Sequence, residues 1–301
     1  MTSAQESPVL VGGTGRSGTT ITGRLLGSHP RMVATKPLEL RFISGKFGVV
    51  DALITAMGWP LAGGDRTTPE MTAAKVCGSW FSRTKPSGVK EGLCRSMTRE
   101  EVLAATTAYE QSFPSDPISA SRDLILRITS ATSGHRADSR WVDTTPSNLR
   151  VAHHVHHLLP KAKFVHMIRD GRDVATSFAY KNFGPDDPFA ALDMWGKRMV
   201  EASQAEAALP TGAAMRFELI DWQVDQRAGL TRLLSFVGED LDPKVLRWYE
   251  LNVSDKAMRS GRWQRDLTKR QGRKLTARYE HWLATLRERF PGQRLPGDPP
   301  E

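Results

Sequence analysis

The sequence predicts an α/β protein built on a parallel sheet. An apolar run at residues 8–12 ends in glycines and leads into a helical pattern at 17–28. A second apolar run, 163–168, is again followed by a polar loop and a helical pattern. Further strand candidates at 141–143 and 213–217 alternate with helical stretches. This alternation is typical of parallel strands whose helical connections cover both faces of the sheet.

The remaining pattern predicts one domain over residues 1–301 with a mainly helical insertion at 44–140. The insertion is rich in Gly, Thr, Ser and Pro over 58–92 and then has helical character at 99–112 and 117–133. Beyond it, apolar periodicity predicts helices at 148–159, 189–208, 225–237, 243–251 and 275–290.

Composition narrows the class of partner. The 301 residues include 42 Lys and Arg against 33 Asp and Glu, a net charge of +9, which favours anionic ligands such as nucleotides and phosphorylated or sulfated molecules. No nucleic-acid motif is present, so we expect no nucleic-acid partner. No apolar run reaches the roughly 18 residues of a membrane span and no signal pattern opens the chain, so we expect a cytoplasmic protein. Cys77 and Cys94 lack nearby metal-ligand companions, and a bridge between them stays open.

A glycine-rich segment at residues 12–20 predicts a phosphate loop between strand and helix. Its backbone N–H groups and the helix N-terminus would surround an anion. Gly13 and Gly18 fit the spacing of a nucleoside-triphosphate loop, but Thr19 stands where that loop has lysine. Arg16 supplies a cation instead, which suits a donor with one diphosphate-like bridge. The alternative is a turn without a ligand.

The loop sequence GRSGTT resembles the 5′-phosphosulfate loop of sulfotransferases that use 3′-phosphoadenosine 5′-phosphosulfate (PAPS), with a motif style close to the bacterial, heparan and protein-tyrosine enzymes. The sequence RDGRDVATS at 169–177 resembles that family's 3′-phosphate element. The resemblance implies a P-loop sulfotransferase fold, PAPS as co-substrate and no metal. It implies that the donor is bound by Gly15, Arg16, Ser17, Gly18, Thr19, Thr20, Arg169 and Ser177.

Two further donor contacts are implied by resemblance. The segment RSGRWQRD, which begins at Arg259, is similar to the family's C-terminal loop, so Gly261 and Arg262 are expected at the nucleotide; an exposed basic loop is the alternative. Phe217 ends a strand candidate where relatives place an aromatic ring near adenine, and a core phenylalanine is the alternative. The resemblance covers both ends of the chain but not 44–140, the expected acceptor-binding insertion or lid.

Sulfuryl transfer by in-line displacement requires a base for the acceptor proton and stabilisation of charge at the donor. Residues 36–43 are similar to the glutamate-x-x-aromatic segment of heparan and protein-tyrosine sulfotransferases, which implies Glu39 as general base with Arg16 stabilising the phosphosulfate. A structural ion pair of Glu39 with Arg41 or Lys36 is the alternative. Many relatives have lysine where Thr144 stands. Asp143 is a second acid/base candidate or positions Thr145.

The sequence is also compatible with other functions and with several classes of acceptor. A P-loop kinase or other nucleotide phosphotransferase would share the strand, loop and helix. The acceptor hydroxyl or amine could belong to a small molecule, carbohydrate, lipid or peptide. Five aromatic residues could line its pocket or fill the core, namely Phe42, Phe47, Trp59, Trp80 and Phe81. Four histidines at helical spacing would suit either a metal or a partly exposed helix face, namely His153, His154, His156 and His157.

Overall fold

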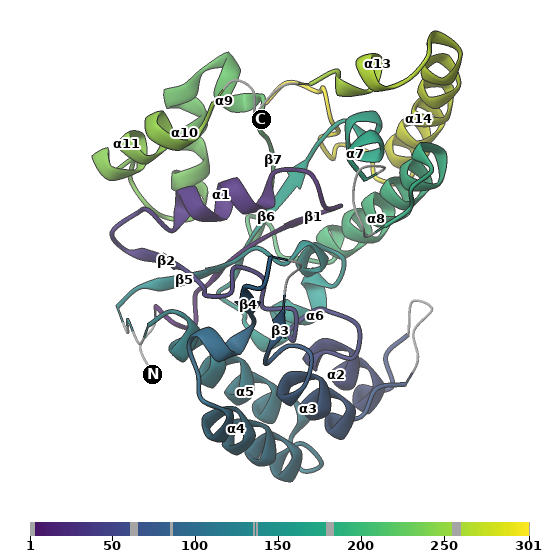
Figure 1. The fold of residues 1–301 in the computed structure, drawn as a ribbon. Helices are drawn as coiled ribbons and strands as arrows, with labels where there is room; N and C mark the ends of the chain where they lie inside the picture. Colours follow the sequence, from purple (N-terminus) through teal and green to yellow (C-terminus); the bar gives the residue numbers. More distant parts are fainter. Residues whose placement is uncertain are drawn as a thin grey trace.

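A five-stranded parallel sheet lies at the centre of the protein (Figure 1). The computed structural model describes residues 4–60, 66–84, 87–134, 136, 138–178, 184–254 and 260–300. Its main sheet has the order β2-β5-β1-β6-β7, and every neighbouring pair is parallel. The strands are β1 (Val9–Gly13), β2 (Met32–Ala34), β5 (Arg140–Asp143), β6 (Lys163–Ile168) and β7 (Ala214–Glu218). The predicted α/β class is confirmed.

Strand β1 occupies the middle of the sheet because it is apolar and buried on both faces. All five of its residues are buried, and it pairs with β5 through Val9 and Val142 and with β6 along its whole length. Side chains alternate between the two faces of a strand. Leu10 accordingly joins one core, whereas Val9 and Val11 join the other.

Helices cover both faces of this sheet. On one face lie α1 (Thr19–Leu26), α10 (Gln226–Phe236) and α11 (Pro243–Asn252), whose leucines and aromatics pack on Val9 and Val11 (Figure 1). The short α9 (Asp221–Val224) precedes α10. The core beside the end of β6 is closed by α7 (Gly171–Phe178), α8 (Pro188–Ala207) and α14 (Lys269–Arg289), with α13 (Arg262–Asp266) leading into α14.

The predicted insertion packs on the opposite face of the sheet, together with α6 (Ala152–Leu158). Its buried residues share one core with Leu10, Trp141 and Phe164 of the sheet, so it is joined to the sheet by a continuous apolar interior. Its elements are α2 (Val49–Met57), α3 (Pro69–Cys77), β3 (Arg83–Thr84), β4 (Lys90–Glu91), η1 (Leu93–Arg95), α4 (Arg99–Ser112) and α5 (Pro117–Thr132).

Element boundaries follow local capping where it is strong. Helix α4 coincides with the predicted range, and Thr98 and Glu101 close its N-terminus with a capping box. Helix α14 begins six residues before the predicted 275, because a second capping box forms at Thr268. The range 148–159 was predicted as one helix and is divided into η2 (Pro146–Leu149) and α6.

We expect Gly12→Ala to destabilise the fold by about 1 to 3 kcal/mol, the usual cost of overpacking a core. An added methyl at Gly12 would overlap Cδ2 of Leu149 and lie 3.1 Å from the carbonyl oxygen of Pro146. Urea unfolding measures the loss. In combination with Leu149→Ala the cost should be smaller than the sum of the single changes, and a loss below about 0.5 kcal/mol for the single change would contradict this packing.

Candidate active site

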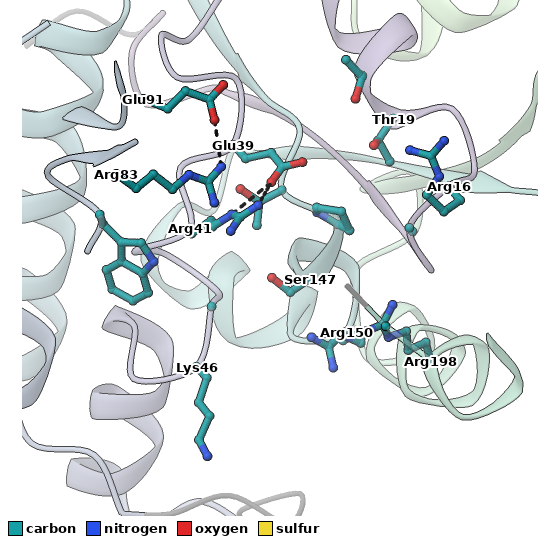
Figure 2. Close-up of a pocket in the computed structure, with 18 of the residues that line it drawn as sticks. Arg16, Thr19, Glu39, Arg41, Lys46, Arg83, Glu91, Ser147, Arg150 and Arg198 are labelled. Atoms are coloured by element: carbon teal, nitrogen blue, oxygen red, sulfur yellow. Dashed lines mark hydrogen bonds and ion pairs between the residues drawn. The ribbon is translucent and has the colours of Figure 1, made fainter. Parts of the chain in front are cut away.

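The carboxyl ends of β1 and β5 open into a cleft of about 1150 Å³, part of whose lining is drawn in Figure 2. Ligands of open parallel sheets bind at this edge, where loops leave adjacent strands. The cleft is lined by the phosphate loop, the Glu39 segment, the insertion and α8. Its lining residues are Gly13, Gly15, Arg16, Thr19, Thr20, Glu39, Arg41, Gly45, Lys46, Lys75, Trp80, Arg83, Thr84, Glu91, Thr145, Pro146, Ser147, Arg150, Phe178, Gly184 and Arg198.

The predicted phosphate loop joins β1 to α1 in a tight, left-handed turn. Gly15 and Gly18 have φ of 84° and 104°, and Arg16 has φ of 59°, a region that residues other than glycine rarely adopt. A side chain at Gly18 would also collide with Leu219. The first amides of α1 have no partner within the helix. The Ser17 hydroxyl is buried and makes no hydrogen bond with any described residue, so the loop holds an unused donor.

The two predicted donor motifs meet at Arg16. Its Nε donates to Ser177 Oγ at 3.0 Å, and Arg169 Nη1 donates to its carbonyl oxygen at 3.2 Å. Burial, and then the nearby charges of Arg169 and Arg262, lower the pKa of Arg16. The guanidinium groups of Arg16 and Arg169 therefore lie together at the phosphate loop, and the charge of Arg262, which pairs with Asp266 at 2.7 Å, acts on them. An anion would stabilise this arrangement.

The predicted C-terminal loop is anchored to the second motif by Asp173. This buried carboxylate accepts from the backbone amide of Gly261 at 2.9 Å and from that of Trp263 at 3.2 Å. The guanidinium of Arg172 lies 4.4 Å from the centre of the Trp263 ring. Arg259, where the motif begins, lies outside the described residues. Sequence reasoning did not single out Asp173.

Phe217 lies in the core rather than in the cleft. It is fully buried, its ring centre is 5.4 Å from that of Trp222, and Arg232 lies over it at 5.3 Å. The predicted stacking on adenine needs an accessible ring face, which this placement does not provide. Phe217 is therefore a core phenylalanine, which was the alternative to an adenine contact.

Glu39 lines the cleft and also pairs with Arg41. Both Arg41 contacts, from Nη2 at 2.7 Å and from Nε at 3.1 Å, reach the same oxygen, Oε2 (Figure 2). Oε1 accepts no hydrogen bond from the described residues. The ion pair expected as an alternative is therefore present, while one carboxylate oxygen stays available to a proton donor.

Asp143 is buried and holds the segment that carries Glu39 through hydrogen bonds. Its side chain is fully buried at the end of β5. It accepts hydrogen bonds from the Leu40 amide at 2.6 Å, from the Thr145 amide and hydroxyl at 3.2 and 3.0 Å, and from Asn148 Nδ2 at 2.5 Å. Burial raises the pKa of Asp143 to about 6, although these donors oppose the shift. Asp143 thus holds the residue next to Glu39.

Thr144 reinforces the same connection. Its amide and its hydroxyl both donate to the Leu38 carbonyl oxygen, at 2.8 and 2.9 Å. Its side chain packs against Gly23, where an added methyl would overlap it. Thr144 therefore supplies no charge at this position, and it fixes the segment that presents Glu39.

A comparison with models of known protein families identifies the family of this chain. The model of the "Sulfotransferase family" matches residues 68–243, more than half of the chain. The chain belongs to the sulfotransferase family. No curated protein matches its sequence.

Solved structures support the fold of this sulfotransferase. The sulfotransferase domain of the Synechococcus PCC 7002 olefin synthase is 16% identical with a TM-score of 0.52, over 96% of this chain and 95% of that one. Sulfotransferase STF9 from Mycobacterium avium is 13% identical with a TM-score of 0.53, over 98% and 79%. STF1 from Mycobacterium tuberculosis H37Rv is 17% identical with a TM-score of 0.50, over 95% and 76%.

The histidine cluster of this sulfotransferase packs on an aromatic residue. The His154 ring stacks on Trp59 at 4.8 Å between centres, and burial, followed by the charges of His153 and His157, lowers the pKa of His154 to about 4. Among the described residues, no group of three or more His, Cys, Asp or Glu is arranged to hold a metal ion. The two cysteines, Cys77 and Cys94, form no disulfide bond with each other. Among the helices that the structure describes, none combines the length and the hydropathy of a membrane span.

Several residues that line the cleft were not predicted from the sequence. Of the five aromatic residues proposed for the pocket, Trp80 lines the cleft, whereas Phe42 and Phe81 are buried in the core. The unpredicted residues include Ser147 and Arg150 after β5, Arg198 on α8, and Lys46 and Lys75 in the insertion. No local motif marks them, because basic residues on helices and loops usually face solvent.

We expect Asp143→Asn to lower the free energy of unfolding by about 1 to 3 kcal/mol, because the new amide cannot accept from all four donors. The loss should depend on pH. Asp143 has a folded pKa of about 6 against an ordinary 3.8, so the folded protein binds the additional proton between these values. Its contribution to stability is therefore present at low pH and is lost as pH rises through about 6. Urea unfolding at pH 4 and pH 7 should show a larger loss at pH 4; an equal loss would contradict the raised pKa.

Proposed function

We propose that this sulfotransferase moves a sulfuryl group from PAPS to a hydroxyl or amine acceptor by in-line displacement. The observation that carries the proposal is the junction at Arg16, which contacts both Ser177 and Arg169. The predicted phosphate loop and the second motif, more than 150 residues apart in sequence, are thus in direct contact, which supports a donor that carries a phosphate group for each.

The donor would lie along this junction. The loop amides of residues 15–20 and the buried Ser17 hydroxyl would bind the 5′-phosphosulfate. Arg169, Ser177, Gly261 and Arg262 would bind the 3′-phosphate, since Asp173 holds the C-terminal loop against the second motif. Thr19 occupies the lysine position of nucleoside-triphosphate loops, which argues against a kinase.

The chemistry needs one base and one cation beside the phosphosulfate. The acceptor oxygen or nitrogen forms a bond to sulfur while the bond from sulfur to the phosphate oxygen breaks, and 3′-phosphoadenosine 5′-phosphate (PAP) leaves. Glu39 would accept the acceptor proton at Oε1, and Arg16 would stabilise the charge that grows on the leaving phosphate. Lys46, Lys75 and Trp80 line the same cleft, which supports the acceptor role proposed for the insertion. The acceptor itself could be a small molecule, carbohydrate, lipid or peptide.

Donor binding should depend on the second motif. We expect PAP to raise the melting temperature more than ATP with magnesium does. Arg169→Ala and Ser177→Ala should each weaken PAP binding by about 1.5 to 3 kcal/mol, the usual value of a charge-assisted hydrogen bond. Calorimetry measures the affinities, with Arg247→Ala, an exposed residue of α11, as the matched control. Adenosine 5′-phosphate should bind as weakly to the wild type as to Arg169→Ala. Unchanged PAP affinity in both variants would remove the 3′-phosphate assignment.

Glu39→Gln tests the base. The change keeps the size of the side chain and removes its ability to accept a proton, so turnover should fall roughly 100-fold or more while PAP affinity changes little. Single-turnover transfer of labelled sulfate measures the rate.

Arg41→Gln provides the comparison for a structural role. An ion pair as exposed as that of Glu39 and Arg41, with 31% and 43% of the side chains accessible, is worth only about 0 to 1 kcal/mol. If the ion pair were the whole role of Glu39, both variants would show the same small loss of melting temperature and neither would lose turnover. Near-normal turnover in a folded Glu39→Gln protein would therefore remove the base assignment.

A further inference from the structure

The cleft carries more positive charge than its own carboxylates balance. Among the described residues that line it, seven are basic and two are acidic. Each carboxylate already has a basic partner, since Glu39 pairs with Arg41 at 2.7 Å and Glu91 with Arg83 at 3.1 Å. The other basic residues are Arg16, Lys46, Lys75, Arg150 and Arg198. Arg16 belongs to the proposed donor site. The positive charge of the other four residues therefore needs another explanation.

Arg150 and Arg198 form the centre of this excess. Arg150 follows η2 and Arg198 projects from α8, and Figure 2 shows the two near Ser147 on the wall of the cleft. Arg198 Nη1 donates to the Thr14 carbonyl oxygen at 2.7 Å and forms no ion pair with any described carboxylate. Arg150 contacts Glu201 at 3.2 Å, and solvent screens this pair because 43% of the Glu201 side chain is exposed. The charges of Arg150 and Lys46 also oppose the burial that raises the pKa of the Asp51 carboxyl.

The two guanidinium groups line the same part of the cleft, near Ser147. Burial and then the charge of Arg150 lower the pKa of Arg198, with Glu201 opposing the shift. Two half-buried cations on a concave surface are stabilised when an anion accepts hydrogen bonds from both, and guanidinium groups suit carboxylate, sulfate and phosphate oxygens. Lys75, whose ammonium lies 5.7 Å from the centre of the Trp80 ring, makes no ion pair with a described residue and extends the positive wall into the insertion.

We propose that the acceptor carries an anionic group, a carboxylate, sulfate or phosphate, besides the hydroxyl or amine that receives the sulfuryl group, and that Arg150 and Arg198 bind it. This inference rests on the proposed sulfuryl transfer and specifies its acceptor. The anion would orient the acceptor in the cleft while its nucleophile faces Glu39 and the phosphosulfate.

Matched acceptor pairs test this assignment. Each pair shares one scaffold and differs in one acidic group: 4-hydroxyphenylacetate with its amide, glucose 6-sulfate with glucose, and glycerol 3-phosphate with glycerol. Transfer of labelled sulfate from PAPS gives kcat/KM for each member. We expect the acidic member to be favoured about ten-fold or more, the value of one charge-assisted hydrogen bond. The favoured anion distinguishes the three acid types.

Arg150→Gln should reduce this preference toward one and leave PAP affinity unchanged. Arg198→Gln should do the same unless its loss of the Thr14 contact disturbs the phosphate loop, which PAP calorimetry reveals. Arg247→Gln, outside the cleft, should keep the wild-type preference.

Equal or higher kcat/KM for the neutral members in all pairs would overturn the proposal and leave sulfuryl transfer standing. If no member of the panel is sulfated, the same compounds are titrated by calorimetry into the protein saturated with PAP. Binding of acidic members that Arg150→Gln abolishes supports the proposal, and its absence overturns it. Failure of the wild type to bind PAP would instead remove the proposed function.

Discussion

The parallel pairing of β1 between β5 and β6 is the constraint on which the site depends. Every residue of β1 is buried and its register with β6 is continuous, so the loops that leave these strands emerge at one edge. The phosphate loop follows β1, the Asp143 turn follows β5, and Arg169 follows β6. A slip in register would separate Arg16 from Arg169 and Ser177. The apolar surface that buries the sheet therefore also fixes the positions of the charged groups.

A buried carboxylate connects this sheet to the segment that carries Glu39. Burying Asp143 opposes its ionised form, and four hydrogen-bond donors offset part of that cost. Its bond to the Leu40 amide and the bonds of Thr144 to Leu38 hold both sides of Glu39. The general base proposed here is thus placed by backbone contacts and not by its exposed ion pair with Arg41, which contributes little rigidity.

Positive charge is concentrated along the cleft in two groups. Arg16 and Arg169 meet at the phosphate loop with the charge of Arg262 acting on them, and Arg150 and Arg198 line the cleft beside this loop, where Arg198 contacts Thr14. Like charges repel within each group, although Arg262 pairs with Asp266 and Arg150 with Glu201. An anion bound to either group would relieve this repulsion in addition to accepting hydrogen bonds. In such a site the negative charge of the ligand neutralises the excess positive charge of the protein. The first group would bind the two phosphate positions of the donor, and the second would bind the anionic group of the acceptor.

Features that short stretches of chain control could be predicted from the sequence alone: the strand, glycine turn and helix at residues 9–26, the helix α4, and the basic residues of the 169–177 motif. These depend on backbone sterics, capping and apolar periodicity within a few residues. Tertiary structure decided the rest, because it depends on contacts between distant segments. Asp173 meets Gly261 across 88 positions, Arg198 reaches Thr14 across 184, and Phe217 is enclosed by Trp222 and Arg232 instead of facing the cleft. Whether a side chain lines a site or fills a core is set by what packs against it, and periodicity alone does not specify that neighbour.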